Sequence, residues 1–289
     1  MRIAVAGTTS AVGRSAVPAL ERAGHALVLL PDDGNALLDV ARMAAALEGC
    51  DALLNLAGQV PVAGVAGRRR AWRRHDLLRS EGVRRLVQAA RESGVRRVVH
   101  QSHSLVYADQ GVAWITEQSP LSVTPATEPA AVGEAAVQGF DGCARVGVVL
   151  RMGLVVGDSG LTRWSLRMCA RGRPIGMGSP DGYVHVIHSD DVGPAIEAAL
   201  AAPSGTYNVG ATPVRRADLV DAHAAMVGRY GGGFMPRWRQ RWCGGLAEPL
   251  GRSLRVSSSQ FASVTGWVPR RQSFDRAWLD AGVREAAQP

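Results

Sequence analysis

Short runs rich in β-branched residues alternate with longer stretches rich in alanine, leucine and arginine along most of this 289-residue chain. Short apolar runs are typical of buried strands, whereas longer stretches with apolar residues at helical spacing are typical of amphipathic helices. Strands that alternate with helices in this way form a parallel sheet with right-handed crossovers. The pattern therefore predicts the α/β class, with a doubly wound parallel sheet.

The same pattern predicts where the elements lie and how the chain divides. Strands are expected at residues 1–6, 26–30, 51–56, 95–101, 146–151 and 206–209, and helices at 12–23, 71–93 and 128–140. Segment 31–39 is too short for the helix that usually separates the second strand from the third. We expect a core over residues 1–161 and a smaller C-terminal substrate lobe over 162–289, interleaved with core strands that return at about 183–210.

The composition argues against several classes of function. With 46% hydrophobic and 20% charged residues, the chain is expected to be an ordinary globular protein. The net charge of +8 comes from scattered arginines without a zinc-finger, RNA-binding or basic-zipper pattern, so no nucleic-acid partner is expected. No apolar run reaches about 18 residues, and the first apolar stretch is too short for a signal peptide, which predicts a cytoplasmic protein with no membrane contact. The cysteines lack metal-ligand spacing, so we expect reduced packing residues and no metal site; they are Cys50, Cys143, Cys169 and Cys243.

A turn rich in small residues connects the first expected strand to the helix after it. At this position the pyrophosphate of a dinucleotide meets backbone N–H groups at a helix N-terminus, and small residues let the backbone come close. Ser10 stands where a central glycine is usual, so a tight turn without a ligand is the alternative. The candidate cofactor-binding residues of the turn are Gly7, Thr8, Thr9, Ser10, Ala11, Val12 and Gly13.

Acidic residues follow the second expected strand. A carboxylate there accepts hydrogen bonds from a ribose 2′-OH and repels a 2′-phosphate, so Asp32 favours NAD over NADP. The alternative is that Asp32 and Asp33 form a polar turn. The other candidate cofactor-binding residues are Asp39, Leu56, Ala57, Gly58 and Gln101.

Several further segments occur in an order that covers nearly the whole chain. Besides the turn at 7–13, they are residues 55–58, 102–107, 150–153, 185–192, 206–210, 255–257 and 265–269. On these segments the chain resembles the extended short-chain dehydrogenase/reductases, the NAD-dependent epimerase/dehydratase family. The resemblance implies a Rossmann-like dinucleotide-binding core, an enzyme that binds NAD or NADP and a small-molecule substrate, and a homodimer formed through helices 71–93 and 128–140.

The catalytic residues of that family are replaced. Its members use a serine or threonine, a tyrosine and a lysine that lowers the pKa of the tyrosine. All 33 Lys and Arg positions of this chain are arginine. Aligned through Glu134, the expected tyrosine and lysine fall near Ala126 and Ala130, and aligned through Tyr107 the expected serine falls on His103. Arginine stays protonated, so any mechanism here must work without an amine.

Other side chains are candidates for catalysis. His103 follows a strand of the parallel sheet, where an imidazole could act as acid or base near neutral pH, and Ser102, Ser104 or Tyr107 could orient a substrate oxygen. A structural histidine is the alternative. Glu128 is a second candidate base, although an acid at the start of a helix is also stabilised by the helix dipole.

The leading hypothesis is therefore an atypical enzyme of this family that acts on a small metabolite, such as a natural-product intermediate. It would use acid/base chemistry without the tyrosine–lysine pair, in a dehydration, isomerisation or cyclisation. The second hypothesis is an NAD(P)-dependent oxidoreductase or epimerase. The third is a non-catalytic sensor of a dinucleotide or metabolite.

Overall fold

A six-stranded parallel sheet forms the centre of the molecule. The structure, a computed structural model, describes residues 1–31, 36–58, 69–142, 144–236, 238, 240, 247–280 and 282. The strands run in the order β2-β1-β3-β4-β5-β9, and each pairs in parallel with its neighbours. Their bounds are β1 (Arg2–Ala6), β2 (Ala26–Leu29), β3 (Ala52–Asn55), β4 (Arg97–His103), β5 (Val146–Met152) and β9 (Gly205–Val209). The predicted α/β class with a parallel sheet is confirmed.

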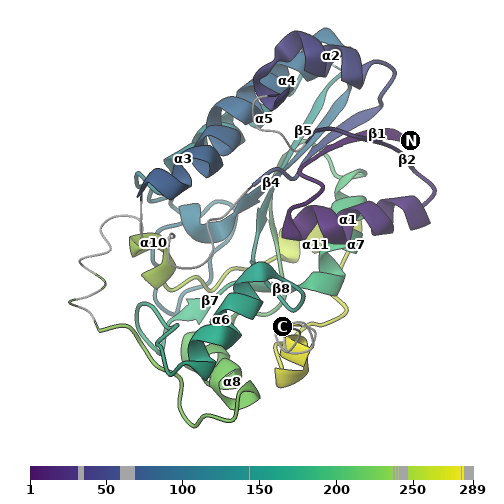
Figure 1. The fold of residues 1–289 in the computed structure, drawn as a ribbon. Helices are drawn as coiled ribbons and strands as arrows, with labels where there is room; N and C mark the ends of the chain where they lie inside the picture. Colours follow the sequence, from purple (N-terminus) through teal and green to yellow (C-terminus); the bar gives the residue numbers. More distant parts are fainter. Residues whose placement is uncertain are drawn as a thin grey trace.

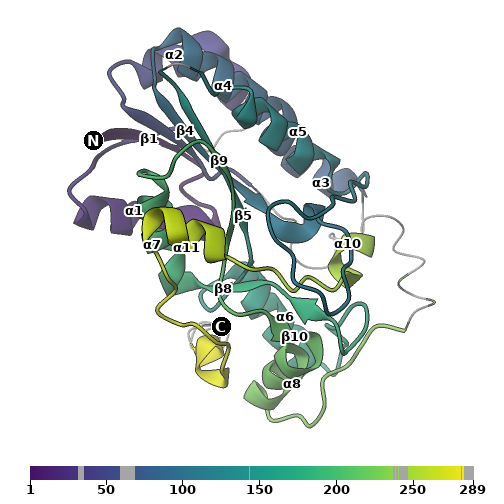
Figure 2. The ribbon, with the colours of Figure 1, turned by 180° about the vertical axis from the view of Figure 1, so that it is seen from behind.

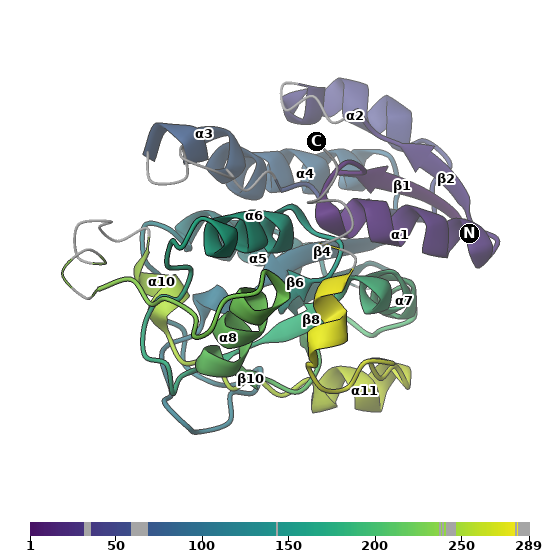
Figure 3. The same ribbon diagram turned by 60° about the horizontal axis from the view of Figure 1, so that its bottom comes forward.

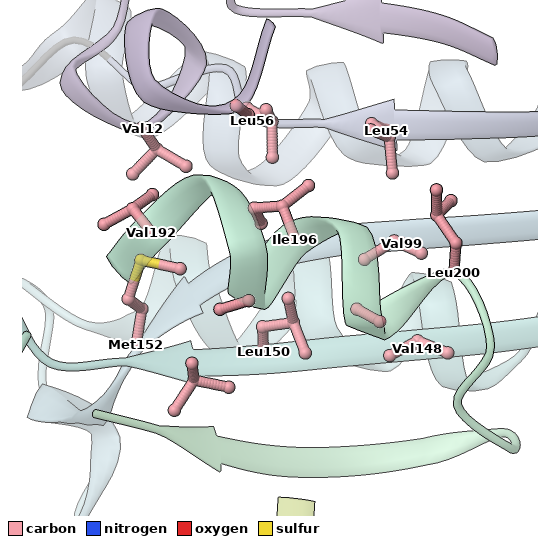
Figure 4. Packing of buried hydrophobic residues seen from close by; sticks show 14 of the residues in the cluster. Val12, Leu54, Leu56, Val99, Val148, Leu150, Met152, Val192, Ile196 and Leu200 are labelled. Carbon is pink, nitrogen blue, oxygen red and sulfur yellow. The ribbon is translucent and has the colours of Figure 1, made fainter. Parts of the chain in front are cut away.

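Helices cover both faces of the sheet (Figures 1 and 2). One face carries α1 (Ala11–Arg22), α7 (Ser189–Ala199) and α11 (Ser259–Thr265). The other carries α2 (Val40–Leu47), α3 (Arg69–Leu77), α4 (Val83–Glu92) and α5 (Glu128–Gln138). Each face has its own apolar core; Figure 4 shows Val192 and Ile196 of α7 with Leu150 of β5 in the first of them. Helices α4 and α5, which the resemblance assigns to a dimer interface, pack against each other, and the homodimer stays a prediction.

A smaller lobe lies beyond the carboxyl ends of β4 and β5 (Figures 1 and 3). It contains two short sheets, in which β6 (Leu154–Val156) pairs with β8 (Val186–His188), and β7 (Tyr183–Val184) pairs with β10 (Val214–Arg215). Its helices are α6 (Gly160–Ala170), α8 (Arg216–Met226), α10 (Glu248–Gly251) and the 3-10 turn η5 (Arg276–Leu279). None of the helices in the described ranges is both long enough and apolar enough to cross a membrane.

Arg252 connects this lobe to the segment after β4. Its buried guanidinium donates to the carbonyl oxygens of Leu105, Tyr107 and Ser122 at 2.8–2.9 Å and pairs with Glu248 of α10 at 2.6 Å. The planar group of an arginine carries five N–H donors, so a single side chain can hold several oxygens at once.

Two elements differ from the sequence prediction. The connection between β2 and β3 does contain a helix. It is α2, which begins after its cap Asp39 and therefore lies beyond the short segment 31–39. The single helix expected over 71–93 is divided into α3, a π-helical turn at Leu78–Gly82 (η2) and α4. A π turn inside a helix often marks a functional position.

Candidate functional site

The glycine turn lies against the end of β3. Gly7 has a φ of +82°, and a Cβ atom there would lie 2.3 Å from the backbone nitrogen of Ala57. A Cβ on Gly13 would lie 2.2 Å from the carbonyl oxygen of Gly7. No side chain fits at either position, and glycine alone adopts the left-handed conformation without strain. In the sheet, β1 lies between β2 and β3, so the order of the strands reverses at β1. Such a reversal is the switch point at which open α/β sheets bind ligands.

The residues of this turn fit a dinucleotide. Ser10 caps α1 by accepting a hydrogen bond from the Gly13 nitrogen at 2.9 Å. The N–H groups of Ala11 and Val12 lie in the first turn of α1, where a helix offers them no acceptor, and such groups bind phosphate. Thr8 and Thr9 form the bend before the helix. The turn is therefore the part of the chain that would hold the pyrophosphate.

The other candidate cofactor residues have varied surroundings. Asp32 lies outside the described residues. Asp39 is exposed and accepts from the Arg42 nitrogen at 3.0 Å, so its observed role is to cap α2. Leu56 and Ala57 are buried at the end of β3, and Gly58 beside them is partly exposed.

Ser102 and Tyr107 belong to a buried polar network, not to an open crevice. Ser102 donates to Glu134 at 2.5 Å, and Glu134 forms an ion pair with Arg151 at 2.7 Å. Arg151 lies over the Tyr107 ring, 4.7 Å from its centroid, and the Tyr107 hydroxyl donates to Asn208 at 2.8 Å. Both candidate residues are 0% exposed, and burial raises the pKa of the Tyr107 hydroxyl although the Arg151 charge opposes this. In this structure both side chains are engaged in the buried network, and their predicted role in orienting a substrate oxygen stays a prediction.

His103 ends β4 at its carboxyl edge and is partly exposed. Its Nδ1 is buried and has no hydrogen-bond partner among the described residues. Burial, followed by the charge of Arg79, lowers the pKa of His103 well below its usual value. A lowered pKa favours the neutral imidazole, which can still donate or accept a hydrogen bond, and the acid/base role of His103 stays a prediction.

The remaining catalytic candidates, Ser104 and Glu128, lie outside the network of Ser102 and Tyr107. Ser104 is buried in the 3-10 turn η3 (Ser104–Val106), where its carbonyl oxygen accepts from the Tyr107 nitrogen at 3.1 Å. Glu128 is exposed at the first position of α5. That position matches the helix-dipole interpretation, and a role for Glu128 as a base stays a prediction. The described residues contain no group of three His, Cys, Asp or Glu side chains arranged to hold a metal.

Sequence reasoning missed a second buried polar group, which lies at the ends of β3 and β4. Arg79, in the π turn, donates to the backbone and side-chain oxygens of Gln101 at 3.2 and 3.0 Å. The Asn55 amide contacts the His100 ring at 3.3 Å. Burial, followed by the charge of Arg79, lowers the pKa of His100 to about 3. The only available signal was the position of these polar residues in or beside otherwise apolar strand ends.

His185 and His188 flank β8 and differ in their bonding. Nδ1 of His188 accepts from the Asp190 nitrogen at 3.1 Å and caps α7, which is a structural role. His185 is buried, and within the described part of the chain neither of its ring nitrogens has a partner. Burial lowers the pKa of His185 to about 3.

The buried His185 should make the protein sensitive to acid. Its folded pKa lies below the value of about 6.5 for an unfolded chain, so the unfolded state takes up the proton first as the pH falls. Stability is then full above about pH 6.5 and decreases toward pH 3. Between pH 7 and 5 we expect this residue alone to cost about 2 kcal/mol of the free energy of unfolding. Urea unfolding of the wild type and of His185→Leu at both pH values measures the effect, and an equal loss in both proteins would contradict it.

Comparison with known proteins agrees with this arrangement. The sequence profile of the NAD dependent epimerase/dehydratase family matches residues 3–210. A 3-diazoavenalumate denitrifying reductase from a Streptomyces species is 31% identical over 231 residues, which cover 72% of this chain and 75% of the relative.

Two solved structures have the same fold. The human epimerase family protein SDR39U1, solved with NADPH, has a TM-score of 0.82 and 21% identity, covering 98% of this chain and 99% of its own. A double mutant of DesIV, a dTDP-glucose 4,6-dehydratase from Streptomyces venezuelae solved with NAD, has a TM-score of 0.79 and 18% identity, covering 100% and 97%. These two likenesses concern the fold alone. From the family profile and the reductase relative it follows that this chain belongs to the NAD-dependent epimerase/dehydratase family.

Proposed function

We propose that this chain is an NAD(P)-dependent reductase that replaces the diazo group of a small organic substrate with hydrogen. The observation that carries the proposal is the combination of a turn that fits a dinucleotide with alanines at the expected tyrosine and lysine positions, Ala126 and Ala130. The 31% identical relative, named as a denitrifying reductase of a diazo compound, supports the same reaction class.

The dinucleotide would be held by the turn from Gly7 to Gly13 and by the adjoining end of β3. The solved structures with NAD or NADPH support binding of either coenzyme. When bound in its reduced form, the coenzyme would supply a hydride. If the diazo group is present as an aryl diazonium ion, its replacement by hydride releases dinitrogen and needs no proton (Ar–N₂⁺ + H⁻ → Ar–H + N₂). A site for this reaction has no need of a tyrosine whose pKa is lowered by a lysine.

The residues of this chain suit such a reaction. His103 is neutral and partly exposed at the carboxyl edge of β4, so it can orient the substrate by a hydrogen bond without acting as an acid. The network of Ser102, Glu134 and Arg151 fixes the strand end that carries it. Orientation of this kind lowers a barrier by holding the reacting groups in place before the reaction.

The test is turnover of 3-diazoavenalumate with NADH and with NADPH. We expect coenzyme oxidation together with release of one dinitrogen per coenzyme, measured by mass spectrometry. A coenzyme deuterated at its hydride position should leave deuterium on the product carbon. His103→Ala should slow turnover without changing this labelling.

Two results would contradict the proposal in different ways. Substrate conversion without coenzyme oxidation would favour the acid/base hypothesis. Coenzyme binding without conversion, across a panel of diazo and carbonyl compounds, would favour the sensor hypothesis.

A further inference from the structure

Arg79 is a buried cation at the candidate site. Its side chain is 4% exposed, and burial lowers its pKa to about 10 although the charge of Glu134 opposes this, so it stays protonated at neutral pH. Its terminal nitrogens donate to two neutral oxygens of Gln101, and its Nε is buried without a partner among the described residues. Burying an ion costs several kcal/mol unless it is paired. An unpaired arginine in this place therefore needs an explanation.

The neighbouring acid does not pair with it. The two oxygens of Glu134 are bound by Ser102 and Arg151, and the described residues offer Arg79 no ion pair. The stretch that follows Gly58, residues 59–68, contains no aspartate or glutamate. Among the described residues, the buried charges here are two guanidinium groups and one carboxylate, with neutral histidines beside them, so one positive charge has no counter-ion in that part of the chain.

The guanidinium lies close to the partly exposed end of β3. A Cβ on Gly58, the partly exposed residue after β3, would lie 3.0 Å from an Arg79 terminal nitrogen and 3.4 Å from its Nε. Arg79 donates to the Gln101 side chain, and Gln101 and His103 are alternate residues of β4, so their side chains leave the same face of the strand. The backbone of Arg79 is held from the other side, because a Cβ on Gly133 of α5 would lie 2.4 Å from its carbonyl oxygen. The charge is thus fixed close to two partly exposed residues, Gly58 and His103.

We propose that Arg79, with His103 beside it, forms a subsite for an anionic oxygen of the substrate, such as a carboxylate or a phenolate. Arginine suits this role because its charge is permanent and its fork of N–H donors matches a carboxylate. The identity of the anion rests on the proposed function, since the substrate of the relative is named as the anion of a diazo-substituted acid. The subsite itself rests on the buried charge and its position.

The experiment compares benzoate with benzamide, which have similar shapes and differ in charge. Isothermal titration calorimetry at constant ionic strength measures both in the wild type, Arg79→Gln, Arg79→Lys and Arg85→Gln. We expect the wild type to prefer benzoate by about tenfold to a hundredfold, as hydrogen bonds between charged groups imply. Arg79→Gln should remove the preference and Arg79→Lys should keep part of it. Arg85, whose side chain is 45% exposed in the Glu81–Arg85 pair, is the matched control and should leave the preference unchanged.

The outcomes separate this proposal from its alternatives. Equal affinity of the wild type for benzoate and benzamide would overturn the subsite, and this comparison needs no variant to fold. An Arg79→Gln protein that keeps the preference for benzoate would also overturn the subsite. A variant that keeps this preference and loses only NADH affinity would show that the charge serves the coenzyme. Benzoate carries no diazo group, so the benzoate titration does not depend on the result of the reductase assay. A protein that is active as a reductase but has no preference for benzoate would refute the subsite and not the proposed function.

Discussion

Replacement of Glu134 by alanine is expected to lower the free energy of unfolding by about 3–5 kcal/mol. The carboxylate pairs with Arg151 at 2.7 Å, and the two side chains are 4% and 5% exposed. Its removal leaves the Arg151 charge buried without a counter-ion and takes away the acceptor of Ser102. Globular domains are stable by only about 5–15 kcal/mol, so urea denaturation followed by circular dichroism should show a large shift of the midpoint.

A matched surface pair provides the control. Glu81 and Arg85 are linked at 2.6 Å, but their side chains are 35% and 45% exposed, so Glu81→Ala should cost less than about 1 kcal/mol. A Glu134→Leu/Arg151→Leu double variant should be more stable than Glu134→Ala, because no charge is then left unpaired. If the free energy of unfolding of Glu134→Ala lies within about 1 kcal/mol of the wild-type value, the Glu134–Arg151 pair does not contribute to stability as a buried ion pair.

The second large effect is expected at Gly7. An alanine there must adopt a φ of +82° and place its Cβ 2.3 Å from the Ala57 nitrogen. The left-handed conformation costs about 1–2 kcal/mol and the overpacking about 1–3 kcal/mol, so we expect a loss of about 3 kcal/mol of stability. The turn must also move away from β3, which should weaken NADH and NADPH binding by at least about tenfold, measured by titration calorimetry.

Gly24 separates the two causes. It has nearly the same backbone angle, a φ of +80°, but nothing lies within 4 Å of the position its Cβ would take. Gly24→Ala should therefore show only the conformational cost of about 1–2 kcal/mol, with coenzyme affinity unchanged. Equal losses of stability and of affinity in the two variants would mean that the close approach of Gly7 to β3 has no role.

The fold was predictable from the sequence because its signals are local. Each strand of the main sheet lies within about two residues of its expected position; β1, for example, occupies Arg2–Ala6 where 1–6 was expected. The helix α2 was missed because its eight residues, Val40–Leu47, give a short pattern with few polar positions. The π turn at Leu78–Gly82 was missed because helical spacing continues through it, and the insertion is visible only in the backbone.

The candidate site was less predictable because sequence does not give the direction in which a side chain points. Successive residues of a strand face opposite sides, so Ser102 and His103 have opposite surroundings: one is buried against Glu134, and the other is partly exposed. Tyr107 matched a family position, yet its hydroxyl points inward to Asn208. Arg79 lies in an arginine-rich helical stretch, where the sequence gives no reason to expect one guanidinium to be buried.

The contacts of Arg252 affect which parts of the molecule can move relative to one another. Its guanidinium group binds three carbonyl oxygens of the segment after β4 and the carboxylate of Glu248 in α10 at the same time. Movement of α10 away from the segment after β4 would break all of these hydrogen bonds together, so we expect the two to move as one unit. The segment that carries Leu105 and Tyr107, directly after His103, is therefore expected to keep its position relative to α10.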